Sequence, residues 1–239
     1  MRSKRVLLKL SGESFCDGSS SISQKCLLRT VEEIKHAISR GVELSIVVGA
    51  GNIWRGVGKF IERVTADKMG MLATVMNALA LNEALLKAKI KAIVLCASGV
   101  SSFVEDFSVE KAINYIELGY VVIFAGGTGN PYFTTDTTAA LRAAEIKTDV
   151  LLKATQVDGV YSADPKKDKG AIKYDFLTFK EAINKQLKVM DSQAFSLCEQ
   201  TNISIIVFDF YKDGNLKKVL CGEKIGTSIS KNSNEYKLP

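Results

Sequence analysis

Short apolar runs that alternate with longer amphipathic stretches limit the fold of this chain more than any other feature. The runs lie at residues 6–10, 42–48, 92–96, 121–125, 150–152, 203–208 and 227–229. Helical patterns separate them at 23–40 (with Ser23 as the expected cap), 69–89, 137–145 and 216–220. Runs of this kind are typical of parallel strands buried on both faces. The succession predicts an α/β protein, a three-layer αβα sandwich with a mostly parallel central sheet.

Nothing in the sequence divides the chain into separate domains. Its 239 residues are 46% hydrophobic, enough for a large core, and there are only 3 prolines and no Gly/Ser-rich linker. We therefore expect a single domain over residues 1–229. Residues 230–239 are polar, and we expect a disordered tail there.

The cysteine and histidine content argues against several kinds of site. The five cysteines lie far apart without a CxxC pair, and His36 is the one histidine. A zinc site would lack ligands, and a Ser/His/Asp triad would depend on that residue alone. The N-terminal apolar run is too short for a signal peptide, and no stretch approaches the roughly 20 apolar residues of a membrane span. We expect a cytoplasmic protein with reduced thiols and no membrane partner.

A formal net charge of +6 raises the question of nucleic-acid binding. The basic residues are spread along the chain, with a loose cluster only at Lys166, Lys167 and Lys169. No basic stripe is interleaved with aromatic residues, as single-strand binders require. We expect no nucleic-acid partner, and a surface that mildly favours anionic substrates.

Four predicted strands end in loops rich in glycine and small polar residues. The loops lie at 9–13, at 49–52 with Arg55-Gly56 following, at 126–131 with Thr134-Thr135-Asp136 following, and at 153–159. Small residues let backbone N–H groups approach phosphate oxygens, and helix N-termini add a favourable dipole. Lys9 and Lys153 would bring positive charge to a transferring phosphoryl group. The loops predict phosphoryl transfer from a nucleoside triphosphate to a small anionic acceptor, at the carboxyl ends of the strands.

Two better-known phosphate-binding motifs do not fit these loops. The sequence contains no GxxxxGK[ST], which excludes a P-loop enzyme. Neither glycine loop satisfies GxGxxG, because Trp54 and Tyr132 stand at or near the place of the third glycine. A Rossmann dehydrogenase is therefore not predicted.

The whole pattern resembles the amino-acid kinase superfamily and, within it, the bacterial uridylate (UMP) kinases. The resemblance runs from Lys4 to about Ile229. It rests on LLKLSGE at 7–13, DKMGMLATVMNALA at 67–80, GTGNPYFTTDTTAALRAAEI at 127–146, LKATQVDGVYSADP at 152–165 and KVMD at 188–191. It implies an amino-acid kinase-like fold with an acceptor-binding lobe and an ATP-binding lobe.

The resemblance also implies which residues form the site. It places ATP at Lys9, Leu10, Ser11, Gly12, Gly51, Arg55, Thr155, Tyr161 and Asp164, the last three around the adenosine. It places UMP at Ala50, Asp67, Thr128, Gly129, Asn130, Pro131, Tyr132, Phe133, Thr134 and Thr135, with Asp67 on the ribose hydroxyls. Lys9, Lys153, Asp136 and Asp191 are the implied catalytic group. Asp136 would orient the lysines or magnesium, and Asp191 would support them.

By the same resemblance, the enzyme converts UMP to UDP with ATP in pyrimidine nucleotide biosynthesis. The attacking UMP phosphate is already an anion, so no general base is needed. Mg²⁺ would sit mainly on the ATP phosphates, with no metal site built by the protein. The family implies a homohexamer, with UTP as a feedback inhibitor. The regions linked to activation by GTP, 16–21 and Asn82-Glu83, depart from the family pattern, so a GTP response is not predicted.

Other interpretations of these residues stay open at this point. The enzyme could be a kinase for a carboxylate or carbamate, or the chain could be a catalytically silent nucleotide sensor. Asp67 could cap a helix beginning near Lys68. Tyr161 could be core filler, and Lys9 a solvated residue at a strand end. Met69, Met71 and Met76 indicate packing or subunit contact rather than ligand binding.

Overall fold

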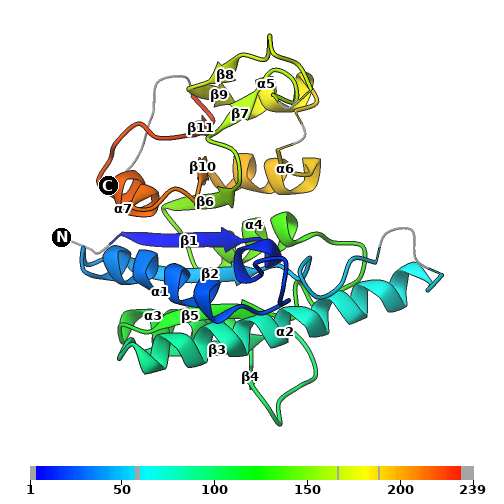
Figure 1. Cartoon of the computed structure of the whole chain (residues 1–239), viewed down its shortest axis with the longest axis vertical. Helices are drawn as coiled ribbons and strands as arrows, with labels where there is room; N and C mark the ends of the chain where they lie inside the picture. Colours follow the sequence, from blue (N-terminus) through cyan, green and yellow to red (C-terminus); the bar gives the residue numbers. More distant parts are fainter. Residues whose placement is uncertain (1–3, 57–59, 166, 188, 233–239) are drawn as a thin grey trace.

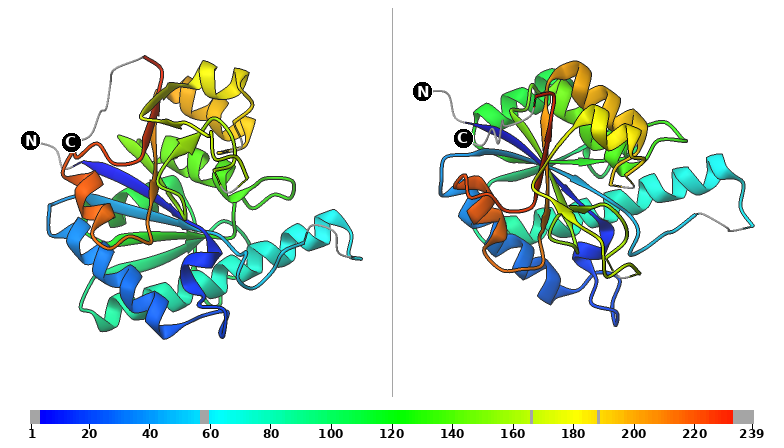
Figure 2. Two further views of the ribbon diagram at one scale, coloured as in Figure 1. Left: turned by 45° about the horizontal axis from the view of Figure 1, so that its top comes forward. Right: turned by 90° about the horizontal axis from the view of Figure 1, so that it is seen from above.

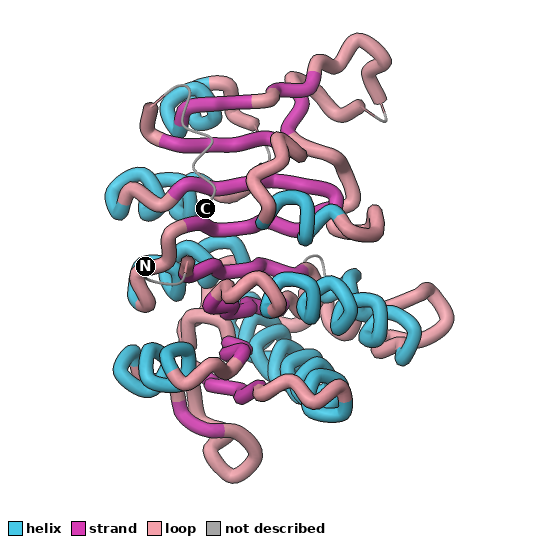
Figure 3. The backbone as a smooth tube through the Cα atoms, turned by 90° about the vertical axis from the view of Figure 1, so that its left-hand side faces the viewer, coloured by secondary structure: helices cyan, strands magenta, loops and turns pink. Residues whose placement is uncertain are grey.

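The computed structural model describes residues 4–56, 60–165, 167–187 and 189–232. Over these residues, one nine-stranded sheet has the order β4-β3-β5-β2-β1-β6-β10-β11-β9 (Figures 1 and 3). Its strands are β1 (Arg5–Leu10), β2 (Glu43–Val48), β3 (Ala92–Cys96), β4 (Glu105–Asp106), β5 (Val121–Ala125), β6 (Val150–Thr155), β9 (Phe176–Thr178), β10 (Ser204–Asp209) and β11 (Thr227–Ser230). Strands β7 (Val160–Tyr161) and β8 (Lys173–Tyr174) form a separate hairpin. Only the β10–β11 pair in the large sheet is antiparallel.

Helices cover both faces of the sheet (Figure 2). Helices α1 (Gln24–Ile38), α2 (Arg63–Lys87) and α7 (Asn215–Leu220) pack on one face, against Val6, Leu8 and Leu10 of β1. Helices α3 (Val109–Glu117), α4 (Thr135–Glu145), α5 (Phe179–Asn184) and α6 (Ser192–Thr201) cover the other face, with Leu7. A 3-10 turn, η1 (Gly12–Phe15), follows β1. The expected αβα sandwich is confirmed.

The seven apolar runs of the sequence are all strands, with boundaries shifted by a few residues. The elements that sequence patterns did not predict are α3, α5, α6 and the short strands β4, β7, β8 and β9. Helix α2 begins at Arg63, six residues before the predicted start at 69. Ser23 occupies the N-cap position of α1, but its hydroxyl donates to Asp17 Oδ2 at 2.5 Å instead of capping the helix.

The structure differs from two further expectations, one on membrane-length apolar segments and one on the C-terminal tail. One described helix, α2, is long and apolar enough to cross a membrane by length and composition, contrary to the expectation from the sequence. Its residues Ala78, Leu81 and Leu85 are fully buried against the sheet, as in the core helix of a folded domain. Ser230, which we expected to belong to the polar tail, is instead a buried residue of β11. Residues 233–239 lie outside the described residues.

Candidate active site

Two lysines meet at the centre of the sheet because of its strand order. Strands β1 and β6 are parallel neighbours, and their register sets Lys9 opposite Lys153. Side chains alternate along a strand, so Lys9 shares the face of Leu7, which α4 covers. The same alternation puts Lys153 on the face of Leu151. Residues 144 positions apart therefore present two ammonium groups side by side, both largely buried.

Asp136, in the first turn of α4, lies between the two lysines. Lys153 Nζ donates to Asp136 Oδ2 at 2.5 Å and also contacts the Val189 carbonyl. Lys9 Nζ lies 3.1 Å from Asp136 Oδ1, as an ion pair without hydrogen-bond alignment. The three ionised groups together carry a formal charge of +1. This Lys9–Asp136–Lys153 cluster is called the charged centre below.

Burial and mutual attraction shift the pKa values in the charged centre. Burial works to raise the pKa of the Asp136 carboxyl, but the charges of Lys9 and Lys153 outweigh it and hold this pKa below its ordinary value. Burial also lowers the pKa of Lys153, while the charge of Asp136 offsets part of that effect. The carboxylate thus stays ionised and keeps the lysine ends in place.

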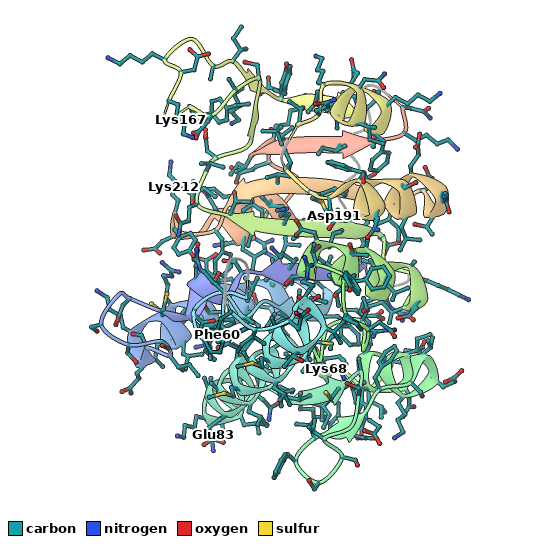
Figure 4. All side chains as sticks on the ribbon, turned by 90° about the vertical axis from the view of Figure 1, so that its right-hand side faces the viewer. Phe60, Lys68, Glu83, Lys167, Asp191 and Lys212 are labelled. Atoms are coloured by element: carbon teal, nitrogen blue, oxygen red, sulfur yellow. The ribbon has the colours of Figure 1, made fainter. Side chains whose placement is uncertain are left out.

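Three cavities open around the charged centre in the described part of the chain. The glycine cavity, about 210 Å³, is lined by Lys9, Ser11, Gly12, Glu13, Gly49, Ala50, Gly51, Arg55 and Thr135. The α2 cavity, about 270 Å³, lies between α2 and the 127–135 segment and shares Ala50 and Thr135 with the glycine cavity. The β7 cavity, about 690 Å³, is lined by Lys153 and by residues of 155–165 and 185–189. All three surround the carboxyl ends of the central strands, the edge seen in Figure 4.

The glycine cavity has the chemistry of an anion site. The backbone N–H groups of Ala50 and Gly51 donate no hydrogen bond within the described residues. Gly12 approaches this loop so closely that a Cβ would lie 2.5 Å from the Gly51 nitrogen. Arg55 is exposed, and its guanidinium pairs with Glu13 and donates to the Gly51 carbonyl at 2.9 Å. Backbone N–H groups beside Lys9 fit phosphate oxygens.

The N-terminus of α4 faces both smaller cavities. Thr134 is the N-cap, and its hydroxyl accepts from the backbone N–H groups of Asp136 and Thr137. Asp191, the N-cap of α6, accepts hydrogen bonds from the hydroxyls of Thr134 and Thr137. Asp191 therefore ties α6 to the start of α4, and its charge also acts on Lys153, whose pKa it helps to raise against the effect of burial. The positive end of the α4 dipole adds to the attraction for an anion.

Asp67 lines the α2 cavity from the second turn of α2. Because α2 begins at Arg63, the interpretation of Asp67 as an N-cap is wrong. The Nε–H of Arg63 donates to both carboxylate oxygens of Asp67, at 2.8 and 2.9 Å, and the backbone N–H of Tyr132 donates to its Oδ2 at 2.8 Å. Tyr132 has a φ of +72°, a left-handed conformation that is uncommon for a residue with a side chain. Asp67 thus holds the 128–135 loop as well as facing the cavity.

The residues assigned to UMP divide between the α2 cavity and its rim. Ala50, Asp67, Thr128, Asn130, Phe133, Thr134 and Thr135 line the cavity. Gly129, Pro131 and Tyr132 belong to the same loop but do not line it. Arg63, Trp54 and Thr74 line it as well and were not predicted from the sequence as site residues. Met71 also lines it, contrary to the expectation that it serves only packing or subunit contact. The Arg63–Asp67 spacing of four residues is the signal that could have indicated Arg63.

The residues assigned to the adenosine end of ATP line the β7 cavity. Thr155, Tyr161 and Asp164 are all at its wall. The Thr155 hydroxyl donates to the Val157 carbonyl at 2.6 Å, so it shapes the loop rather than offering a donor to a ligand. Tyr161 is half-buried, and its hydroxyl donates to Asp158 at 2.6 Å, with its ring beside the cavity rather than in the core. Leu10 is fully buried and lines none of the three cavities. Its carbonyl accepts a hydrogen bond from the Gly49 N–H.

This arrangement defines an α/β enzyme built to handle phosphorylated substrates at the carboxyl edge of its sheet. The sequence profile of the Amino acid kinase family matches residues 4–209, and the chain belongs to that family. The UMP kinase from Bacillus anthracis is similar at a TM-score of 0.94 and 36% identity, covering 97% of this chain and 98% of that one. The UMP kinase from Ureaplasma parvum has a TM-score of 0.91 and 41% identity, over 97% of this chain and 100% of that one. The uridylate kinase from Archaeoglobus fulgidus has a TM-score of 0.71 and 30% identity, over 94% of this chain and 99% of that one.

Proposed function

We propose that this enzyme transfers the γ-phosphoryl group of ATP to UMP, giving UDP and ADP, in the cytoplasmic synthesis of pyrimidine nucleotides. The observation that carries the proposal is the charged centre, with Lys153 at the wall of the β7 cavity and Lys9 in the glycine cavity. The glycine cavity adjoins the α2 cavity, and Ala50 and Thr135 line both. A donor in the β7 cavity and an acceptor in the α2 cavity would therefore meet at the two lysines. The similarity to UMP kinases supports the choice of acceptor.

The proposed reaction is an in-line displacement. An oxygen of the UMP phosphate forms a bond to the γ-phosphorus, the bond to the bridging oxygen of ATP breaks, and its electron pair leaves on ADP. The acceptor oxygen is already anionic at neutral pH, so the step needs no histidine or other base. Lys9, Lys153 and the N–H groups of the glycine cavity would stabilise charge on the transferring group.

The residues present fit a magnesium ion that arrives with ATP. Within the described residues, no group of three His, Cys, Asp or Glu side chains could hold a metal by itself. Asp136 is the carboxylate of the charged centre, and among the described residues its Oδ1 accepts no hydrogen bond, with Lys9 Nζ 3.1 Å away as an ion pair. We expect Mg²⁺ to be held mainly by ATP phosphates, with Asp136 orienting the lysines beside it. When bound, the ion neutralises phosphate charge and so lowers the repulsion between the two substrates.

The proposal is tested by ADP release from ATP and Mg²⁺ with UMP, CMP, dTMP, carbamate or N-acetylglutamate as acceptor. We expect rapid release with UMP and slow release with CMP. Equal turnover of UMP and CMP would show that the α2 cavity does not select the uracil base. Turnover with a carboxylate or carbamate alone would identify another kinase of the family. No acceptor-dependent release would favour a nucleotide sensor.

The Asp67→Asn variant tests the acceptor end of the site. A carboxylate on ribose hydroxyls makes charge-assisted hydrogen bonds worth about 1.5–3 kcal/mol. We expect a roughly tenfold to hundredfold rise in the KM for UMP, with the KM for ATP nearly unchanged. Asparagine keeps an acceptor for the Tyr132 N–H, so the loop should stay in place. A raised KM for ATP with UMP unaffected would mean that donor and acceptor occupy the opposite cavities.

We also propose that the chain assembles as a homohexamer, with UTP as an inhibitor that competes for the UMP site. The solvent side of α2 supports self-association: Leu72, Met76, Leu79 and Leu86 are 39–55% exposed and recur at helical spacing along one stripe. Lys68 and Glu83 mark the course of this helix in Figure 4.

We expect Met76→Glu to reduce the assembled mass in light scattering, because it places a charge in the centre of the apolar stripe. Gln24→Glu, at an exposed position of α1, adds the same single negative charge away from this stripe and should leave the mass unchanged. A wild-type chain that is monomeric at micromolar concentration would contradict the assembly.

A further inference from the structure

A buried pair of asparagine side chains lies directly beneath the glycine cavity. Asn77, on α2, is fully buried. Its Nδ2 donates to the Gly49 carbonyl at 2.8 Å and to Asn52 Oδ1 at 2.8 Å. In return, Asn52 Nδ2 donates to Asn77 Oδ1 at 2.9 Å. The amide of Asn77 is thus hydrogen-bonded to both the first and the last residue of the 49–52 loop.

The Asn52 amide extends this contact to two other segments. Its Nδ2 donates to the Ser21 carbonyl at 2.6 Å. Its Oδ1 lies against Gly12, where an added Cβ would come within 2.3 Å of it. The pair therefore connects α2 with both glycine-containing loops of the cavity. Between its two points of attachment lie Ala50 and Gly51, whose N–H groups have no partner in the described residues.

A buried amide at this position has a cost that an apolar residue would avoid. Asn77 lies on the inner side of α2, next to Ala78 and one turn from Leu81, where the helix otherwise buries apolar side chains. A buried amide is tolerated when its hydrogen bonds are satisfied. Because hydrogen bonds are directional, the amide then fixes one position of the loop against the helix, whereas an apolar contact would allow several. Fixing the direction of the Ala50 and Gly51 N–H groups is a benefit that leucine or alanine could not supply.

We propose that Asn77 is a positioning residue, which acts through Asn52 and the Gly49 carbonyl to aim the N–H groups of the 49–52 loop at a phosphate. The kinetic part of this inference rests on the proposed function. A displaced loop would stabilise the transferring phosphoryl group less well, while substrate contacts elsewhere in the α2 and β7 cavities would persist.

The test uses three variants, Asn77→Ala, Asn52→Ala and the double variant Asn52→Ala/Asn77→Ala. The control is Ala78→Gly. Ala78 is the buried neighbour of Asn77 on α2 and makes no polar side-chain contact, so Ala78→Gly loosens the helix without touching the amide pair. We expect Asn77→Ala to lower kcat roughly 10- to 100-fold with smaller changes in both KM values. Because the two residues act together, the double variant should lose about as much as the worse single variant.

Hydrogen exchange of the segment 49–53 provides a second readout that does not depend on activity. We expect faster exchange of the hydrogen-bonded Gly49 and Ile53 amides in both asparagine variants and not in Ala78→Gly. Asn52→Ala breaks the pair from the half-buried side, so it stands in if Asn77→Ala does not fold. Unchanged exchange and kcat in a folded variant, or fully additive losses, would overturn the inference. If the wild type releases no ADP with UMP, the proposed function fails, while the exchange result still decides whether the pair holds the loop.

Discussion

Replacing Lys9 by alanine is expected to lower kcat by roughly 10²-fold or more. The ammonium group of Lys9 lines the glycine cavity and is held by Asp136 at 3.1 Å, so it points at the place where the proposed reaction develops charge. UMP binding should change much less, because the α2 cavity does not include Lys9. The measurement is steady-state ADP release, with calorimetry to show that the variant is folded.

The matched control for this experiment is Lys35→Ala. Lys35 is an exposed residue of α1 whose ammonium lies 3.8 Å from Glu32. Its removal takes away the same charge from the surface and should leave kcat unchanged. A folded Lys9→Ala enzyme with wild-type kcat would show that Lys9 is only a structural lysine at a strand end.

Asp136→Asn is expected to reduce both stability and activity. The substitution leaves two largely buried lysines without their shared counterion, and breaking a buried ion pair from one side costs about 3–5 kcal/mol. We expect a lower free energy of unfolding in urea and, because the lysine ends lose their position, a large fall in kcat. In Lys9→Met/Asp136→Asn the uncompensated charge is reduced, so part of the stability should return.

The pH dependence of stability gives an independent check on Asp136. Its pKa is lower in the folded protein than in the unfolded chain, where it has its ordinary value of about 3.9. Its contribution is therefore fully present above that value and is lost as the pH falls through the folded pKa. The stability difference between wild type and Asp136→Asn should shrink only in this acidic range. A difference that already disappears near neutral pH would contradict an ionised Asp136.

The sequence predicted the sheet well because its strands are buried on both faces. A strand such as β5, Val121–Ala125, is covered by helices on either side, so its sequence is a short continuous apolar run, which is typical of a buried strand. The short strands β4 and β9 have no such run and were missed. The four loops were predicted as well, because the carboxyl ends of parallel strands meet at one edge and only small residues fit close to a phosphate.

What the sequence could not determine was which of these groups touch one another. Lys9 and Lys153 are each visible as a lysine at a strand end, but their pairing depends on β1 and β6 being neighbours in register. Asp67 was assigned to the acceptor, but the alternative that it caps a helix stayed open until the structure placed it in the second turn of α2, bonded to a backbone group 65 positions away. Asn77 lies in the 67–80 stretch that carries the resemblance, but no role could be assigned to it, since a buried asparagine in an apolar helix has meaning only through Gly49 and Asn52.

The sequence by itself thus determined the layers, the strands and the loops, because periodicity and residue size act locally along the chain. The tertiary structure decided the charged centre and the supports of the cavities. The charged centre and these supports depend on strand order, on strand register and on the residue at which helix α2 begins. These are properties of the packed chain as a whole, set by which arrangement buries the apolar faces of all its helices at once.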